Sequence, residues 1–193
     1  MDDVGLILRA LEFAARRHRT QKRKGEDQSP YINHPIQVAS LLANEGGERD
    51  PVLLTAAILH DVIEDTVDTQ EEKEELIKQI SELFGEQVLS LTLEVTDDKS
   101  LDKQERKRLQ IENAPHKSDN AKKLKIADKI MNIQDITNNP PTWWSVQRII
   151  EYFDWAEKVV AGLRGVNKRL EDMFDECLKN GRAKYIGQPI KQA

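Results

Sequence analysis

The sequence predicts an all-α, single-domain protein. Nearly every segment of its 193 residues repeats apolar side chains with the spacing of a helix, and the alternation typical of strands is scarce. The chain is long enough for one domain with a sizeable core. Hydrophobic residues make up 38% and charged residues 33%, a balance that fits a globular protein with a well-solvated surface.

A loop separates the first two predicted helices. The first begins near Leu6, continues through the basic stretch RRHRTQKRK and stops at Gly25. The second begins at Pro35, because proline suits the first helical position. Gly46 and Gly47 end it.

The next two predicted helices start at Pro51 and Thr69. The first of them contains the stretch LLTAAILHDVIEDT, which has the pattern of one continuous amphipathic helix. In the second, Thr69 and Glu72 have the spacing of a capping box, and Gly85 is the stop. The predicted buried stripe of this helix consists of Leu76, Ile80 and Leu83.

The second half of the chain is predicted to begin with a short helix or ordered loop, EQVLSLTLEVTDD. Ser100 is the predicted cap of the helix LDKQERKRLQIENA, and Asp119 or Asn120 that of AKKLKIADKIMNIQDI. After TNNPP, a long helical pattern runs from about Trp143 to Leu178.

Charge and cysteine content exclude several classes of protein. The net charge of -5 argues against a general nucleic-acid coat protein. The single cysteine, Cys177, allows no intramolecular disulfide and no cysteine-based zinc site, which favours a reducing compartment. No apolar run approaches membrane-spanning length, and the start MDDVGLILRALEFA is too acidic and too periodic for a signal peptide. We therefore expect a cytoplasmic protein.

Four ionisable residues interrupt the apolar stretch that begins at Leu53. On a continuous helix they would lie within an arc of roughly 140°, on the buried side. Burying unpaired charges is costly, so internal salt bridges or a metal ion must compensate. Within one turn on the same helix there is no lysine or arginine to neutralise them, which favours the metal. The four residues are His60, Asp61, Glu64 and Asp65.

Two other segments supply further metal donors. His34 lies in YINHP, where the following Pro35 fixes it in extended geometry at a helix entrance. Asp128 lies in KLKIADKIMN, on the same predicted face as Leu124 and Met131. Taken singly, His34 is equally well explained as a helix cap, and Asp128 as the ion-pair partner of neighbouring lysines.

The order His34, His60-Asp61, Asp128 resembles that of the HD-domain metal-dependent phosphohydrolases. More narrowly, the chain is similar to the hydrolase domain of RelA/SpoT proteins and to its stand-alone form, the metazoan-type small alarmone hydrolases. AAILHDVIEDT matches the HDxxED segment of that family, and RTQKRKGEDQSPYINHP its loop before the first ligand histidine. EVTDDKS, ERKRLQ, KIADKIMNI and RIIEYFDWAEKVV match later blocks in order. A departure is Thr20, where many relatives have glycine.

The resemblance implies a metal centre and two catalytic carboxylates. It implies one divalent metal, usually Mn²⁺, with Zn²⁺ and Fe²⁺ as alternatives for a site of nitrogen and oxygen donors. The implied ligands are His34, His60, Asp61 and Asp128, and the implied catalytic pair is Glu64 and Asp65. The expected domain spans residues 1–193, with an HD core at about 31–135 and C-terminal helices at about 143–180.

The implied reaction is removal of the 3′-pyrophosphate from ppGpp or pppGpp, the alarmones of the stringent response. The alternatives are another phosphorylated nucleotide, such as NADPH losing its 2′-phosphate, and a nucleotide sensor without activity. The implied substrate-binding residues are Arg23, Lys24, Tyr31, Lys99, Asn132, Arg148 and Tyr152. The basic run 16–24 would also suit a solvated face or a nucleic-acid patch, and Tyr152 a packing position. We expect no nucleic-acid or membrane partner, and a monomer or weak homo-oligomer.

Overall fold

The structure is a computed structural model that describes residues 2–186. It is built of helices, with no strand among those residues, so the predicted all-α class is confirmed. The described residues form two compact units. One comprises the residues up to Gln21 together with Pro30–Arg106, and the other comprises Lys22–Ser29 together with the residues from Lys107 onward. The single domain expected over residues 1–193 stays a prediction, and residues 1 and 187–193 lie outside the described part.

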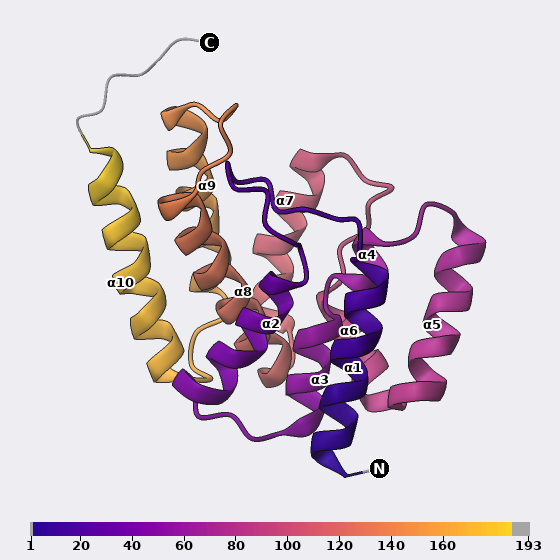
Figure 1. Ribbon diagram of the computed structural model, residues 1–193. Coiled ribbons are helices and arrows are strands. Elements are labelled where there is room, and N and C mark those ends of the chain that lie inside the picture. The colour runs from indigo at the N-terminus through magenta and orange to yellow at the C-terminus, as the bar shows by residue number, and fades with distance from the viewer. Residues whose placement is uncertain (1, 187–193) are drawn as a thin grey trace. The chain divides into compact units, whose positions relative to one another are not determined.

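A central apolar helix organises the first unit. Helix α3 contacts α1, α2 and α6. Because every side chain from Thr55 to Leu59 is buried, which covers all faces of the helix, it can only lie inside the unit. The helical elements of this unit are α1 (Asp3–Arg17), α2 (Asn33–Ser40), the π-helical turn η1 (Leu41–Glu45), α3 (Pro51–Leu59), α4 (Val62–Asp65), α5 (Gln70–Phe84) and α6 (Glu86–Val95) (Figure 1).

The first helix is shorter than predicted. It ends at Arg17 instead of Gly25, and the amide of His18 closes its last turn on the carbonyl of Ala14 at 2.9 Å. Beyond it the backbone pairs with itself as a hairpin, in which the amide of Arg23 donates to the carbonyl of Ser29 at 2.9 Å. These hairpin bonds satisfy backbone groups that the predicted helix would have used.

Several predicted helix ends are confirmed. Asp50 accepts a hydrogen bond from the amide of Val52, so the helix starts at Pro51. The capping box of Thr69 and Glu72 is present in full. Gly85 ends α5 with a φ of 86°, a conformation that favours glycine.

The predicted buried stripe of α5 is wrong at its last position. Leu83 is 39% exposed, whereas the neighbouring Phe84 is only 6% exposed and packs edge-on against Phe13 at a ring distance of 5.6 Å. The larger aromatic ring takes the core position because it buries more apolar surface.

The stretch LLTAAILHDVIEDT is not one helix, so the predicted 140° arc is wrong. Helix α3 ends at Leu59, His60 and Asp61 form a turn, and α4 begins at Val62. The cause is local: Nδ1 of His60 lies 2.7 Å from the carbonyl oxygen of Ala57. In a continuous helix that carbonyl accepts from the amide of residue 61, so the imidazole competes with the backbone at this point.

The second unit is built around α8, which packs against both α9 and α10 (Figure 1). Its elements are the hairpin 22–29, the C-terminal part of α7 (Lys103–Asn113), the 3-10 turn η2 (Ala114–His116), α8 (Asp119–Asn138), α9 (Val146–Ala161) and α10 (Lys168–Tyr185). Its core includes Leu124 and Ile126 of α8, Phe153 of α9 and Phe174 of α10, each fully buried.

Two predicted caps are displaced by one or two residues. Asp102, not Ser100, accepts hydrogen bonds from the first amides of α7, those of Gln104 and Glu105. Ser118, not Asp119 or Asn120, caps α8 by accepting from the amide of Ala121. Adjacent residues of similar capping ability leave such boundaries open in a sequence.

The predicted long helix from Trp143 to Leu178 is two helices. Helix α9 stops at Ala161, and Gly165 has a φ of 99° in the connection before α10. One carboxylate oxygen of Glu171 accepts hydrogen bonds from the amides of Gly165, Val166 and Asn167 and so holds this connection. Within residues 2–186, every helix is too short or too polar to cross a lipid bilayer.

Candidate active site

His60 and Asp61 occupy the turn between α3 and α4. The hydrogen bond between Nδ1 of His60 and the carbonyl of Ala57 requires a proton on Nδ1, which leaves the lone pair on Nε2. That Nε2 lies 3.1 Å from Oδ2 of Asp61. A backbone carbonyl thus sets the tautomer in which an imidazole binds a metal through Nε2.

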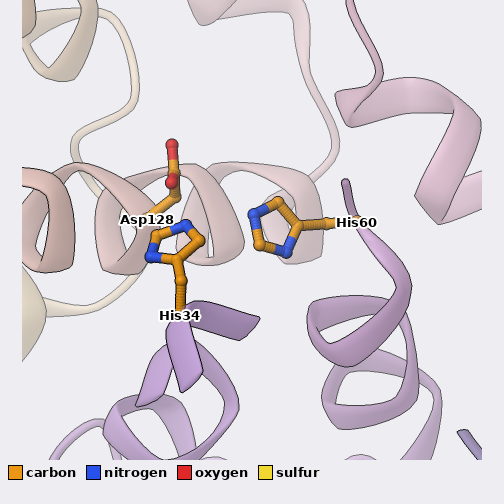
Figure 2. Close-up of side chains that lie close together, drawn as sticks. All are labelled: His34, His60 and Asp128. Carbon is orange, nitrogen blue, oxygen red and sulfur yellow. The ribbon is translucent and has the colours of Figure 1, made fainter. Parts of the chain in front are cut away.

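His34 reaches the same carboxylate from the first turn of α2. Its side chain is buried, and its ring centroid lies 5.4 Å from that of His60 at an angle of 60°. Nε2 of His34 is 3.7 Å from Oδ2 of Asp61. Figure 2 shows the imidazoles of His34 and His60 directed toward one another.

These three donors have the chemistry of a divalent metal site. Two imidazole nitrogens and a carboxylate oxygen suit manganese, iron or zinc better than magnesium or a thiolate-preferring ion. If the imidazole of His60 is neutral, the lone pair on its Nε2 faces a carboxylate oxygen at 3.1 Å, and a divalent cation bound by both atoms removes the repulsion, as a second proton on the ring also would. The residues of the first unit therefore fit a metal ion.

Tyr31 holds the carboxylate of Asp61. Its hydroxyl donates to Oδ2 of Asp61 at 2.6 Å, and its ring lies 4.9 Å from that of His18 and 5.9 Å from that of His34. The sequence predicts Tyr31 as a substrate-stacking residue. In the structure the hydroxyl contacts a predicted metal ligand, and stacking on substrate stays a prediction.

Glu64 lies in α4 in a largely buried position. Burial, together with the nearby carboxylates of Asp97, Asp61 and Asp65, raises its pKa to about 7. One carboxylate oxygen accepts from the amide of Asp97 at 3.2 Å, and the other lies 3.8 Å from the guanidinium of Arg106. A carboxyl group with this pKa can both accept and donate a proton near neutral pH.

The second catalytic candidate, Asp65, is fixed by two donors. The ammonium of Lys99 contacts Oδ1 of Asp65, and the amide nitrogen of Gln21 donates to Oδ2 at 3.0 Å. Lys99 is predicted to bind a substrate phosphate, and its side chain is exposed. This ion pair is one of the salt bridges that the sequence leaves open as an alternative explanation of the carboxylates.

Asp128, the fourth predicted ligand, belongs to α8 of the second unit and is drawn on that helix in Figure 2. Its Oδ1 accepts from the amide nitrogen of Asn132 at 2.6 Å, and its Oδ2 accepts from the ammonium of Lys129 at 2.9 Å. The predicted pairing with a neighbouring lysine is therefore present. Such partners also orient a carboxylate that binds a metal.

Arg23 and Asn132, both predicted to bind substrate, contact each other within the second unit. Nη2 of Arg23 donates to the amide oxygen of Asn132 at 2.9 Å, and its guanidinium also pairs with Asp135. Lys24 is exposed on the same hairpin. Asp135 is not predicted from the sequence, although it follows Asn132 by three residues, within one turn of the same helix.

Arg148 and Tyr152 adjoin a cluster of aromatic rings. The guanidinium of Arg148 lies 4.5 Å from the ring centroid of Trp144. The ring of Tyr152 lies 5.9 Å from Trp144 and 5.3 Å from Trp155. Burial raises the pKa of Tyr152 to about 12, so its phenol stays neutral. Packing, the predicted alternative for Tyr152, is thus part of its role.

Comparison with known proteins decides the family. Residues 10–151 match the HD domain family. The chain belongs to the HD domain family. The predicted resemblance to this family is thereby confirmed.

Relatives within the HD domain family are similar to this chain over most of its length. The guanosine-3′,5′-bis(diphosphate) 3′-pyrophosphohydrolase MESH1 of Xenopus tropicalis is 51% identical over 173 residues, which are 90% of this chain and 93% of that protein. MESH1 of Homo sapiens is 51% identical over 177 residues, 92% of this chain and 95% of that protein. A solved structure described as a metazoan ortholog of SpoT that hydrolyzes ppGpp matches with a TM-score of 0.84 and 46% identity, covering 90% and 94% of the two chains.

Several residues that contact the candidate site are not predicted from the sequence. Arg106 approaches Glu64 from α7, and Gln21 and His18 reach the site from the segment after α1. The arginine and the glutamine stand among charged residues typical of a surface. His18 does have a signal, because it continues the buried i, i+4 series of Ala10 and Ala14.

Proposed function

We propose that this chain is a metal-dependent hydrolase of guanosine-3′,5′-bis(diphosphate). The single observation that carries the proposal is the 51% identity, over 90% of the chain, to proteins named for that reaction. In the reaction, water adds to the phosphorus next to the ribose 3′-oxygen and the bond between them breaks. Pyrophosphate leaves, GDP remains from ppGpp or GTP from pppGpp, and the 3′-oxygen takes a proton.

The proposed metal ligands are His34, His60, Asp61 and Asp128. His34, His60 and Asp61 are donors of the first unit, and Asp128 is a carboxylate donor on α8 of the second unit. We propose Mn²⁺ as the ion, with Zn²⁺ and Fe²⁺ as alternatives. A bound divalent ion would lower the pKa of a water molecule and polarise the phosphorus.

Glu64 and Asp65 are the proposed catalytic residues, with different tasks. Glu64, with its pKa near 7, takes the proton of the attacking water and can return one to the leaving 3′-oxygen. Asp65 is held by Lys99 and Gln21, so it orients the water with little motion of its own.

The proposed substrate contacts divide by charge. Arg23, Lys24 and Lys99 would bind the pyrophosphates, since a guanidinium or ammonium pairs well with phosphate oxygens. Asn132, Tyr152 and Tyr31 would contact the nucleoside, and Arg148 would supply a further cation near the substrate. Arg23 is now paired with Asp135, so substrate phosphate must compete with that carboxylate for the guanidinium. A cytoplasmic location, the absence of nucleic-acid partners and a monomeric or weakly oligomeric state stay predictions.

The test is a product assay. Manganese-loaded protein is mixed with ppGpp, the nucleotides are separated by ion exchange, and NADPH is run in parallel. We expect GDP and pyrophosphate, and no product after chelation. Glu64→Gln should keep the metal but lose turnover, because an amide cannot accept the proton. If the protein turned over NADPH and not ppGpp, the substrate would be reassigned to NADPH. If it turned over neither, a nucleotide sensor without activity would be favoured.

A further inference from the structure

His18 is a buried histidine in the first unit, at the end of α1. Only 2% of its surface is exposed, and its backbone amide is fixed to the carbonyl of Ala14. Its ring contacts two residues. One of them, Gln21, hydrogen-bonds to Asp65, and the other, Tyr31, hydrogen-bonds to Asp61.

The first connection runs through Gln21. Nδ1 of His18 lies 2.6 Å from Oε1 of Gln21, and the amide nitrogen of Gln21 donates to Oδ2 of Asp65 at 3.0 Å. An ionised carboxylate only accepts hydrogen bonds, so Gln21 must turn its NH₂ group toward Asp65 and its oxygen toward His18. Nδ1 of His18 must then carry the proton. With its proton on Nδ1, the imidazole holds the oxygen of Gln21 and so supports the orientation in which the NH₂ group faces Asp65.

The second connection runs through Tyr31. The rings of His18 and Tyr31 lie 4.9 Å apart at an angle of 31°, and the hydroxyl of Tyr31 donates to Asp61. Backbone bonds stiffen the arrangement: the amide of Gln21 donates to the carbonyl of His18, and the amide of Tyr31 to the carbonyl of Gln21, each at 3.0 Å. The segments that bear Gln21 and Tyr31 are therefore held in register at His18.

We propose that His18 is a positioning residue, which aligns the catalytic carboxylate Asp65 with the metal ligand Asp61 through Gln21 and Tyr31. The proposal rests on the function proposed above. Burial lowers the pKa of His18, in keeping with a neutral ring that donates from Nδ1 alone. Such alignment matters because a displacement of about 1 Å at a reacting group can cost on the order of 100-fold in rate.

Two substitutions of His18 separate the two connections. His18→Phe keeps a ring against Tyr31 but has no donor for Gln21. It should lower kcat for ppGpp by about 10-fold to 100-fold, with KM and the Mn²⁺ dissociation constant little changed. His18→Asn keeps an N–H near the position of Nδ1 but has no ring. It should weaken Mn²⁺ binding by about 10-fold, because Tyr31 would no longer be held against Asp61.

Gln21→Met provides an independent test at a half-buried position, where folding is less at risk. It removes the donor to Asp65 and should reproduce the kcat loss of His18→Phe. The double variant should be no slower than either single variant, since both break one connection. Ile80→Val is the control for a modest loss of packing, because Ile80 is fully buried in α5 away from these contacts, and it should leave kcat unchanged.

The measurements are steady-state kinetics with ppGpp, Mn²⁺ binding followed by electron paramagnetic resonance, and thermal unfolding. The proposal is supported if His18→Phe mainly loses kcat while His18→Asn mainly loses Mn²⁺ affinity. Equal losses of kcat and Mn²⁺ affinity in both, or losses that merely follow the melting temperature, overturn it. If the wild type bound Mn²⁺ but did not turn over ppGpp, the proposed function would fail, while the Mn²⁺ affinities of the two variants would still decide the role of His18.

Discussion

The hydroxyl of Tyr31 donates a hydrogen bond to Oδ2 of Asp61 at 2.6 Å, the same oxygen that lies 3.1 Å from Nε2 of His60. The carboxylate of Asp61 is therefore oriented by Tyr31, a residue that is not itself a predicted metal ligand. The loop before α2 therefore contributes to the metal site through an orienting hydrogen bond as well as through His34.

Tyr31→Phe should weaken Mn²⁺ binding by about 10-fold while leaving the fold intact, because the loss of an orienting partner typically costs 10-fold to 100-fold in metal affinity. Isothermal titration calorimetry with Mn²⁺ measures the change. Tyr185→Phe is the matched control, since the hydroxyl of Tyr185 donates to the carbonyl of Ile136 within the second unit. Equal Mn²⁺ affinity for Tyr31→Phe and the wild type would show that Asp61 needs no such partner.

Glu64 should make the metal-free protein less stable as the pH rises. Its pKa of about 7 in the folded state exceeds the ordinary 4.5, so between these values the folded state binds more protons than the unfolded state. The free energy of unfolding then falls with increasing pH, by roughly 3 kcal/mol at most. Urea unfolding of chelated protein at pH 5 and pH 8 measures the loss. Glu64→Gln should lose distinctly less stability over that range, and equal losses would mean that Glu64 titrates normally.

His60→Ala should abolish Mn²⁺ binding and ppGpp turnover together. The variant removes both the Nε2 donor and the hydrogen bond to the carbonyl of Ala57. His116→Ala is the control, because His116 is an exposed histidine of η2. Retention of stoichiometric Mn²⁺ by His60→Ala, measured by elemental analysis after gel filtration, would contradict the assignment of His60 as a ligand.

Gly181→Ala should destabilise the second unit. A Cβ at this position of α10 would lie 2.8 Å from Oγ1 of Thr137 and 3.1 Å from the ring of the fully buried Phe153. Overpacking of this kind costs about 1–3 kcal/mol, more than the roughly 1 kcal/mol that alanine gains in helix propensity. A lower melting temperature is expected in calorimetry. Asn180→Ala, at the exposed neighbouring position, should show no loss.

Local sequence signals predict much of the fold because their physics is local. The capping box of Thr69 and Glu72, the start at Pro51 and the stop at Gly85 each depend on residues within one turn. The break at His60 is not predictable in this way. The apolar spacing continues through it, and the break comes from a side chain that competes for the carbonyl of Ala57.

The site shows the same division. Histidines and carboxylates within an apolar stretch predict metal chemistry, because burial of such groups needs compensation. The residues that orient them cannot be predicted from spacing. Gln21 reaches Asp65 across 44 positions of sequence, and Arg106 lies near Glu64 only because the chain returns through α6. Contacts between residues so far apart in the sequence depend on the packing of whole helices.

The four-residue helix α4 has too few internal hydrogen bonds to be stable alone. It is held at its end by Arg17, whose guanidinium donates to the hydroxyl and the carbonyl oxygen of Thr66. By contrast, α3 is buried at every position from Thr55 to Leu59, whereas in α4 only Val62 and Ile63 are buried. Hydrogen exchange should therefore find two levels of protection across the turn at His60 and Asp61, with amides 62–66 opening well below the cost of global unfolding. Mild denaturant would then release the segment that carries Glu64 and Asp65 first, while the histidine that ends α3 stays anchored.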